Sequence, residues 1–174
     1  MVEDSRITVR PAVAGDAAAI GAVFNAAVRT GWNFLGQMVE RPMFPPEYWD
    51  QLVVDHQPPD VLVVADHGTG GVVGYCAAHP DDGELHLLFV HPDHGGRGIG
   101  GALLTLAHDA LRSAGCSEAY LFTHERNVGP LGFYASVGYR PDGTDRTADF
   151  HGTTIRELRL VAPLEPATPF AIRE

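Results

Sequence analysis

The residues most suited to chemistry in this sequence form a glycine-rich stretch just past the middle of the chain. Five glycines stand within seven residues, at positions 95, 96, 98, 100 and 101. An apolar, strand-like run at 85–90 precedes them, and apolar residues at helical spacing follow from Leu103 to Ala114. Glycine lets successive backbone N–H groups turn toward one point, and a helix N-terminus adds unpaired donors and partial positive charge. This order predicts a binding site for a phosphate or pyrophosphate.

Two familiar phosphate loops fit the stretch poorly. A Walker loop ends in Gly-Lys-Ser/Thr, and this stretch contains no lysine. The dinucleotide pattern G-x-G-x-x-G can be laid on residues 96–101, but it belongs in a first strand–helix–strand unit with an acidic residue about 20 positions on. Glu118 would have to serve as that acidic residue. An unrelated nucleotide binder is therefore the weaker alternative.

The stretch resembles the signature of the GNAT superfamily of acyl-CoA-dependent N-acetyltransferases. It matches the pattern V-x-P-x-x-(Arg/Gln)-G-x-G-(Ile/Val)-G-x-x-L-L at Val90, Pro92, Gly96, Gly98, Ile99, Gly100, Leu103 and Leu104. It departs at Gly95, where the family has Arg or Gln, and Arg97 could partly compensate. The resemblance implies acetyl-CoA as acyl donor, with its pyrophosphate held by Gly95, Gly96, Arg97, Gly98, Ile99, Gly100 and Gly101.

A second motif, residues 127–139, is similar to the other signature of this family. Asn127, Phe133, Tyr134, Gly138 and Tyr139 match its pattern, while Pro130 replaces the usual alanine. The resemblance implies that Asn127 binds the pantetheine arm and that the Tyr134 hydroxyl lies beside the thioester sulfur. A Phe-Tyr pair before a glycine can also simply pack, so a structural role for Tyr134 is the alternative.

The implied reaction is acetyl transfer from acetyl-CoA to an amine by direct attack. The family polarises the thioester carbonyl with a backbone N–H at the end of the central strand, which falls at Phe89 or Val90. The departing thiolate needs a proton. Tyr134, whose unperturbed pKa is about 10, stays protonated at neutral pH and can act as general acid.

The amine must lose a proton before or during attack, since an alkylamine has a pKa near 10.4. Glu84 is a candidate base because it lies six residues before Val90, where some family members carry a catalytic glutamate. His86 is two residues further on, so both side chains are expected on the same face of the sheet. His124 and Glu125, just past the next strand, are further candidates. Alternatively, Glu84 only ends a turn and His86 is a core histidine.

No metal site is expected. His91 and His94 are three apart, but Pro92 between them breaks helical geometry, and no cysteine cluster joins them. His79 and His151 stand alone in the sequence.

The surrounding elements predict an α/β fold of the α+β type. Strands are expected at 7–10, 61–65, 72–78, 84–90, 119–123 and 155–161, with another opening at Tyr139. Helices are expected between Asp16 and Thr30, at 33–40, at 46–54, before Gly115 and at 129–136. The resemblance implies a single-domain GNAT fold: a mixed, mostly antiparallel sheet of six or seven strands, helices on both faces, and splayed central parallel strands at 84–90 and 119–123. The aromatic, proline-broken segment 32–59 is interpreted either as core cover or as a pocket wall for the acceptor.

Chain length and net charge indicate the domain organisation and the kind of substrate. The 174 residues predict one N-acetyltransferase domain, 1–162, and a proline-rich extended tail, 163–174. A net charge of −10 argues against a nucleic-acid partner and mildly favours a cationic substrate. No signal peptide and no membrane span are expected, so the cytoplasm is the predicted location. The predicted acceptor is a small-molecule amine; a peptide N-terminus, an acyl-CoA-binding sensor with little turnover, and a homodimer stay open.

Overall fold

The computed structural model describes residues 7–165, in which one seven-stranded sheet has the order β1-β2-β3-β4-β5-β7-β6. The strands are β1 (Thr8–Pro11), β2 (Val61–Asp66), β3 (Val72–His79), β4 (Glu84–Val90), β5 (Glu118–His124), β6 (Arg140–Phe150) and β7 (Thr153–Pro163). The α-helices are α1 (Ala17–Gly31), α2 (Pro46–Asp55), α3 (Ile99–Ser113) and α4 (Val128–Ser136). Short 3-10 helices are η1 (Ala14–Asp16), η2 (Asn33–Glu40), η3 (Gly68–Gly70) and η4 (Pro92–His94).

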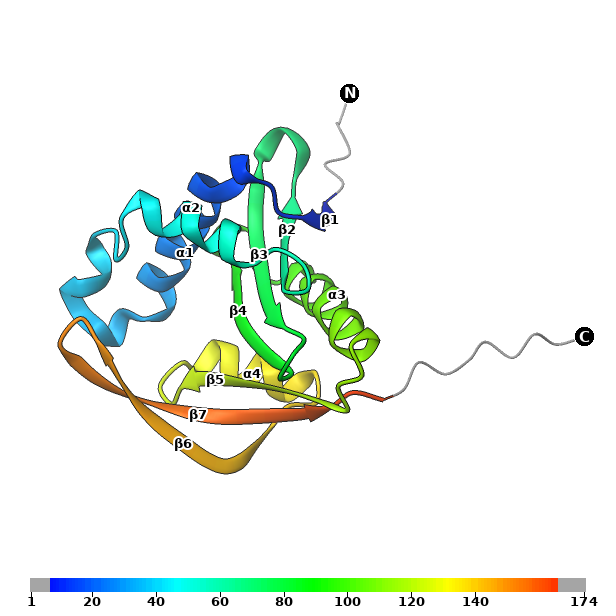
Figure 1. Cartoon of the computed structure of the whole chain (residues 1–174). Helices are drawn as coiled ribbons and strands as arrows, with labels where there is room; N and C mark the ends of the chain where they lie inside the picture. The colour runs from blue at the N-terminus through cyan, green and yellow to red at the C-terminus, as the bar shows by residue number, and fades with distance from the viewer. Residues whose placement is uncertain (1–6, 166–174) are drawn as a thin grey trace, which may run out of the picture.

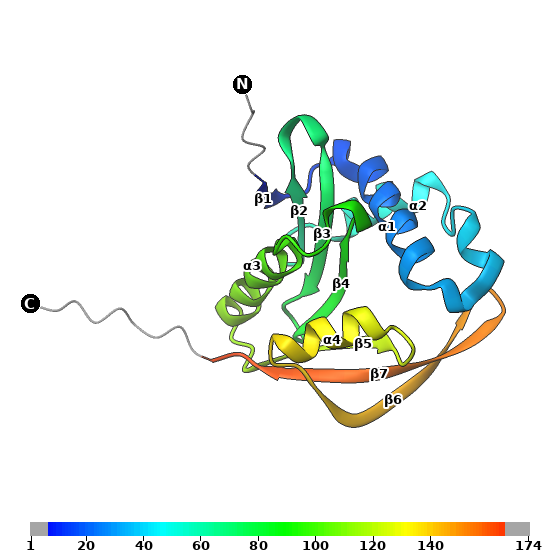
Figure 2. The ribbon, with the colours of Figure 1, turned by 180° about the vertical axis from the view of Figure 1, so that it is seen from behind.

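The helices cover the two faces of the sheet (Figures 1 and 2). Helix α3 packs on one face, where it buries residues at helical spacing, Leu103, Leu104, Ala107 and Leu111. Helices α1 and α2 pack on the other face in a separate apolar cluster that includes Phe24 and Trp49. The predicted α/β class, with a mostly antiparallel sheet and helices on both faces, is confirmed.

The central strands diverge. All other neighbouring pairs in the sheet are antiparallel, whereas β4 and β5 run parallel and pair only at Glu84 and Tyr120. Beyond that point β5, β7 and β6 turn away from β1–β4, as Figure 1 shows. The splayed parallel pair implied by the resemblance is therefore present, and it leaves one edge of β4 without a partner strand.

The structure differs in detail from three of the elements expected from the sequence. The helix expected at 33–40 is a 3-10 segment interrupted at Gly36, whose φ of +61° is left-handed. The last strand, expected at 155–161, runs from Thr153 to Pro163, and it pairs with the 11-residue β6 (Arg140–Phe150). The sequence predicted no end for β6, because its residues are largely exposed and show no apolar alternation. The boundary expected after residue 162 falls within β7, which runs to Pro163; the amide of the buried Leu164 then donates to Ser117 O (2.8 Å). The rest of the expected tail, 166–174, lies outside the described residues.

No helix between residues 7 and 165 combines the length and the apolar character needed to cross a membrane.

Helices α1 and α2 approach closely at Gly21. A Cβ added there would lie 2.7 Å from both Cδ1 and Nε1 of the buried Trp49 indole. We expect Gly21→Ala to lower the free energy of unfolding by about 1–3 kcal/mol, because the overpacking cost exceeds the gain in helix propensity. Urea unfolding measures the change.

Gly132→Ala in α4 is the matched control, since nothing lies within 4 Å of the Cβ position there. That variant should be neutral or slightly stabilised. Equal stability of the two alanine variants would contradict the packing argument.

Candidate active site

A cavity of about 770 Å³ occupies the opening between β4 and β5. Its walls come from the C-terminal end of α1, from η2, β4 and the glycine loop, from the start of α3, from β5 and α4, and from β7. Most lining side chains are apolar. Polar groups that reach it include Thr30, His86, His94, Thr123, His124, Asn127, Tyr134 and Glu157. An apolar cleft with a few convergent polar groups is the usual form of a ligand site.

The glycine loop forms one end of this cavity. Gly95, Gly96, Gly98, Ile99, Gly100 and Gly101 all line it. Gly96 and Gly98 have left-handed φ values of +72° and +80°, and Gly98 is the residue before α3. Ala102 makes the first helical hydrogen bond, donating to Gly98 O (3.0 Å), so the preceding three amides of α3 are the unpaired N-terminal donors of the helix.

Arg97 does not belong to this lining. Its side chain is exposed, although it lies in the middle of the loop. The missing Arg or Gln at position 95 is therefore not replaced by a guanidinium within the cavity. His94 lines the cavity, although it was not predicted to be a site residue.

The β3–β4 ladder determines which amides of β4 face the opening. His91 N donates to Val73 O (2.8 Å), so the amide just beyond β4 faces β3. Because N–H groups alternate sides along a strand, the amides of Val90 and Leu88 face the gap toward β5. Of the two predicted positions, Val90 therefore presents its N–H to the opening, whereas Phe89 lines the cavity without doing so.

The second motif places its two predicted ligands at the opposite wall. Asn127 is buried at the start of α4, with its Nδ2 3.4 Å from Thr123 Oγ1. Tyr134 is 8% exposed and packs against the rings of Phe133 and Tyr139. Burial raises the pKa of Tyr134 well above 10, so its hydroxyl stays protonated.

The structure separates the predicted bases. His86 lines the cavity, whereas Glu84 lies outside the lining and contacts the His86 ring, with Oε1 3.7 Å from Nδ1. The two side chains thus share a face, as predicted, and the His86 ring lowers the pKa of Glu84. Glu125 also lies outside the lining and pairs with Arg156 on the surface (2.8 Å).

His124 lines the cavity but is arranged as a donor. Its Nδ1 accepts the Arg126 amide (2.8 Å), and its ring stacks on Phe34. A neutral ring that accepts at Nδ1 carries its proton on Nε2. Burial lowers the pKa of His124, which favours this neutral form.

One carboxylate in the cavity lining, Glu157, was not predicted from the sequence. Glu157 comes from β7, opposite His124 in the β5–β7 register, and it accepts a hydrogen bond from Arg146 Nε (2.6 Å). Its side chain is 18% exposed. It is the only acidic side chain among the residues that line the cavity. No sequence signal marks it, because it stands in an ordinary alternating strand.

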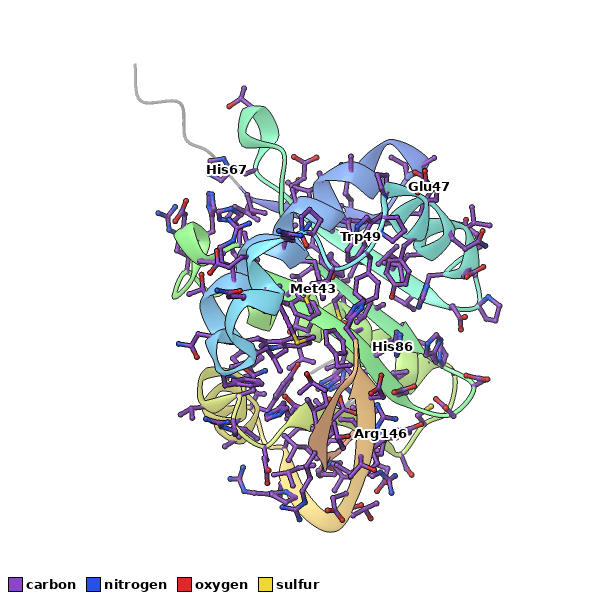
Figure 3. The ribbon with its side chains drawn as sticks, turned by 90° about the vertical axis from the view of Figure 1, so that its left-hand side faces the viewer. Met43, Glu47, Trp49, His67, His86 and Arg146 are labelled. Atoms are coloured by element: carbon purple, nitrogen blue, oxygen red, sulfur yellow. The ribbon has the colours of Figure 1, made fainter. Side chains whose placement is uncertain are left out.

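The aromatic segment 32–59 both covers the core and contributes to the cavity wall. Trp32, Phe34 and Leu35 line the far end of the cavity. Trp49 and Met43 are buried and point into the molecule, whereas Glu47 projects from its edge (Figure 3). Phe150, near the tip of the β6–β7 hairpin, packs on Trp32 with ring centroids 5.3 Å apart, which joins the hairpin to this wall.

One histidine expectation is wrong. His79 does not stand alone in the fold, because its ring lies 5.0 Å from the rings of both His56 and His86.

A splayed parallel strand pair, a helix N-terminus lined with glycine and a cleft with a buried tyrosine define a class of enzyme that transfers acyl groups from coenzyme A thioesters. The comparisons with known proteins agree. Residues 29–139 match the model of the Acetyltransferase (GNAT) family, and the chain belongs to this family of acyltransferases, as its sequence signatures predicted.

The relatives include an acetyltransferase of Yersinia pestis (strain Pestoides F), which is 32% identical over 106 residues, 60% of this chain and 74% of the relative. Among solved structures, the PaiA N-acetyltransferase of Thermoplasma acidophilum in complex with coenzyme A gives a TM-score of 0.75 at 17% identity, over 91% of this chain and 99% of that one. YncA of Salmonella typhimurium, a putative acetyltransferase with its cofactor acetyl-CoA, gives 0.70 at 23% identity, over 96% and 99%. These two neighbours share the fold.

Proposed function

We propose that this enzyme transfers the acetyl group of acetyl-CoA to a primary amine of a small, cationic acceptor. The observation that carries the proposal is the path that the cavity follows between the elements that line it. It runs from the glycine loop along the open edge of β4 to an aromatic wall with one carboxylate. One end suits a pyrophosphate and the other suits an ammonium group, with free amides and a phenol between them.

The donor end follows from the unpaired backbone groups. The amides at the start of α3 bind the pyrophosphate, which also gains from the partial positive charge of the helix N-terminus. Asn127 holds the pantetheine arm from the α4 side. The Val90 N–H binds the thioester oxygen and stabilises the negative charge that develops there during attack.

In the chemical step the amine from one end of the cavity reacts with the thioester held at the other. The amine nitrogen attacks the thioester carbonyl carbon, and the C–S bond breaks as the tetrahedral intermediate collapses. The thiolate of CoA takes a proton from the Tyr134 hydroxyl, and the proton that the attacking nitrogen loses as the amide forms passes through solvent to restore the phenol.

The acceptor arrives as an ammonium ion and must give up one proton before its nitrogen can attack. Glu157 is placed to bind the ammonium and then accept this proton. The Glu84–His86 pair is the other candidate, because His86 reaches the cavity. The aromatic residues Trp32 and Phe34 favour a compact organic cation at this end.

The test is a screen of free-thiol release from acetyl-CoA with small primary amines and with peptides. We expect turnover with cationic small amines. Turnover with peptides alone would instead identify an N-terminal peptide acetyltransferase. Binding of acetyl-CoA without turnover on any amine would identify a sensor domain.

Glu157→Gln tests the acceptor end. We expect KM for the amine to rise about 10- to 100-fold, because a charge-assisted hydrogen bond worth about 1.5–3 kcal/mol is lost, while KM for acetyl-CoA stays unchanged. Steady-state kinetics with each substrate varied in turn measures both constants.

Glu125→Gln is the matched control, since it removes the same charge from the neighbouring surface outside the cavity. A similar change of amine KM in both variants would mean that the amine is attracted by long-range electrostatics and does not contact Glu157 directly.

A further inference from the structure

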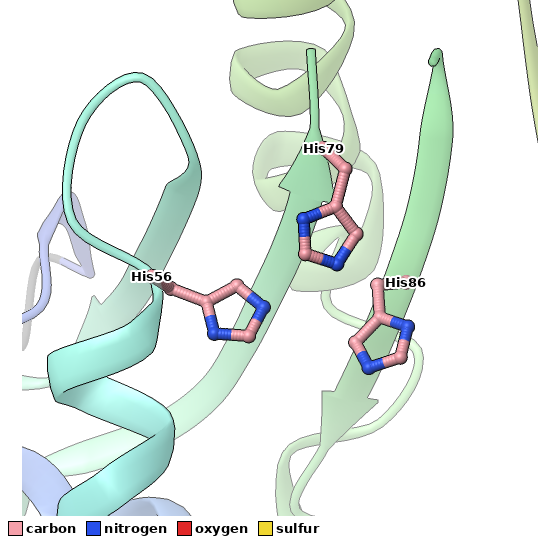
Figure 4. Close-up of side chains that lie close together, drawn as sticks. All are labelled: His56, His79 and His86. Atoms are coloured by element: carbon pink, nitrogen blue, oxygen red, sulfur yellow. The ribbon is translucent and has the colours of Figure 1, made fainter. Parts of the chain in front are cut away.

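Three histidines from separate elements converge near the turn end of the β3–β4 hairpin (Figure 4). His56 follows α2, His79 ends β3 and His86 lies in β4. Each offers a ring nitrogen, and these nitrogens all lie within 4.8 Å of one another. The His86 position depends on a β-bulge, because Ala77 pairs with Leu87 while Ala78 pairs with Leu85. A bulge of this kind re-aims a side chain, here toward the other two rings.

Each ring has an acceptor near its Nδ1. His56 Nδ1 donates to Leu52 O (2.9 Å). His79 Nδ1 lies 3.3 Å from Asp60 Oδ2, and His86 Nδ1 lies 3.7 Å from Glu84 Oε1. The carbonyl fixes the tautomer of His56, and the nearby carboxylates favour a protonated Nδ1 on the other two rings. Nε2 is then the ligand atom, which is the usual outer arrangement of a metal-binding histidine.

His56 supplies the second observation. The residue is 8% exposed, and its Nε2 is buried without a hydrogen-bond partner among the described residues. In Figure 4 its ring points toward the other two histidines. A buried ring nitrogen with no partner costs free energy unless something binds it.

We propose that His56, His79 and His86 bind a divalent transition-metal ion, with Zn²⁺ the best fit. Three imidazoles suit zinc, copper or nickel, and they do not suit Mg²⁺ or Ca²⁺, which take oxygen ligands. Zn–N bonds of about 2.0–2.1 Å in tetrahedral geometry place ligand nitrogens about 3.3 Å apart, so small ring rotations close the site. The fourth position is taken by water.

The ion would join α2 to the β3–β4 hairpin beside the cavity. It would also occupy the Nε2 of His86, which lines that cavity, and so remove this nitrogen from proton transfer. Glu157 would then be the base for the amine. The metal plays no part in the acetyl transfer proposed above, so the two proposals can fail separately.

The experiment uses the full chain, free of any histidine tag and stripped by a chelator. Zn²⁺ is titrated in competition with a chromophoric chelator, and Co²⁺ serves as a spectroscopic probe. We expect one equivalent to bind, a Co²⁺ visible spectrum typical of tetrahedral nitrogen ligation, and a rise in Tm of about 5–10 °C at a hundredfold excess of free Zn²⁺ over its Kd.

His79→Gln is the informative variant, because His79 is partly exposed and its replacement should leave the fold intact. It should weaken Zn²⁺ binding by about 100-fold or more, and Asp60→Asn, which alters the group behind His79, by about tenfold. His67→Gln is the control, since His67 belongs to another histidine pair, with His94. Binding that survives in His79→Gln, or that is lost in His67→Gln, would overturn the proposal, as would the absence of a one-to-one complex.

Discussion

Tyr134→Phe is expected to lower kcat for acetyl transfer by about 100-fold, while the Kd for acetyl-CoA changes by no more than about twofold. The substitution removes only a hydroxyl, and the ring keeps its contacts with Phe133 and Tyr139. In the proposed mechanism the phenol donates its proton when the C–S bond breaks, because an unprotonated thiolate is a poor leaving group in a cavity with few polar partners. Thiol-release kinetics and calorimetric titration with CoA measure the two quantities.

The pH profile of the wild type provides a second readout. Burial raises the pKa of Tyr134 above its usual 10, so its protonated, proton-donating form persists to higher pH than that of a free phenol. We therefore expect no alkaline loss of kcat below about pH 10 from this group.

Tyr120→Phe is the matched control. Tyr120 lies on β5 outside the cavity lining, and its hydroxyl donates to Asp82 (2.9 Å). This variant should keep wild-type kcat. If Tyr134→Phe instead lost CoA affinity and kept its turnover, the hydroxyl would be a binding group and not the acid.

Gly98→Val is expected to weaken acetyl-CoA binding by about 100-fold. Gly98 has φ +80° at the entry to α3, a conformation that a β-branched residue adopts only with strain. Relieving that strain turns the following amides away from their common point, and each charge-assisted hydrogen bond lost to the pyrophosphate is worth about 1.5–3 kcal/mol. Calorimetric titration with CoA gives the change in Kd.

Gly115→Val separates strain from binding. Gly115 has φ +92° at the other end of α3 and lies outside the cavity lining. Both variants should lose similar stability in urea unfolding, whereas Gly115→Val should bind CoA normally. If both lost affinity alike, the glycine loop would act only through the stability of α3.

The exposed position of Arg97 makes the effect of Gly98→Val on CoA binding easier to interpret. With neither an Arg or Gln at position 95 nor a guanidinium from Arg97 in the cavity, residues 95–101 offer the proposed pyrophosphate main-chain donors and the helix N-terminus, and the neighbouring His94 is the one polar side chain of this end that lines the cavity. A change in loop conformation should therefore not be masked by a guanidinium contact.

The sequence alone determined the parts of the site that are local. The glycine loop, the start of α3, Asn127 and Tyr134 stand in short contiguous motifs, whose conformation depends on neighbouring residues, and all of them reach the cavity. Most helices and strands followed in the same way, because buried residues recur at a helical or strand period. The exposed β6 has no such period, so the length of the last hairpin was missed.

Only the tertiary structure decided which distant residues share the cavity. It brought Glu157 from β7 opposite His124, and it left Glu84 and Arg97 outside the lining. It also gathered His56, His79 and His86, each of which looks like an isolated histidine along the chain. These outcomes depend on the divergence of β4 from β5 and on a bulge in β4, which arise from strand pairing between segments far apart in sequence. Local periodicity contains no information about such pairing, and for that reason the acceptor end and the histidine cluster appear only in the folded chain.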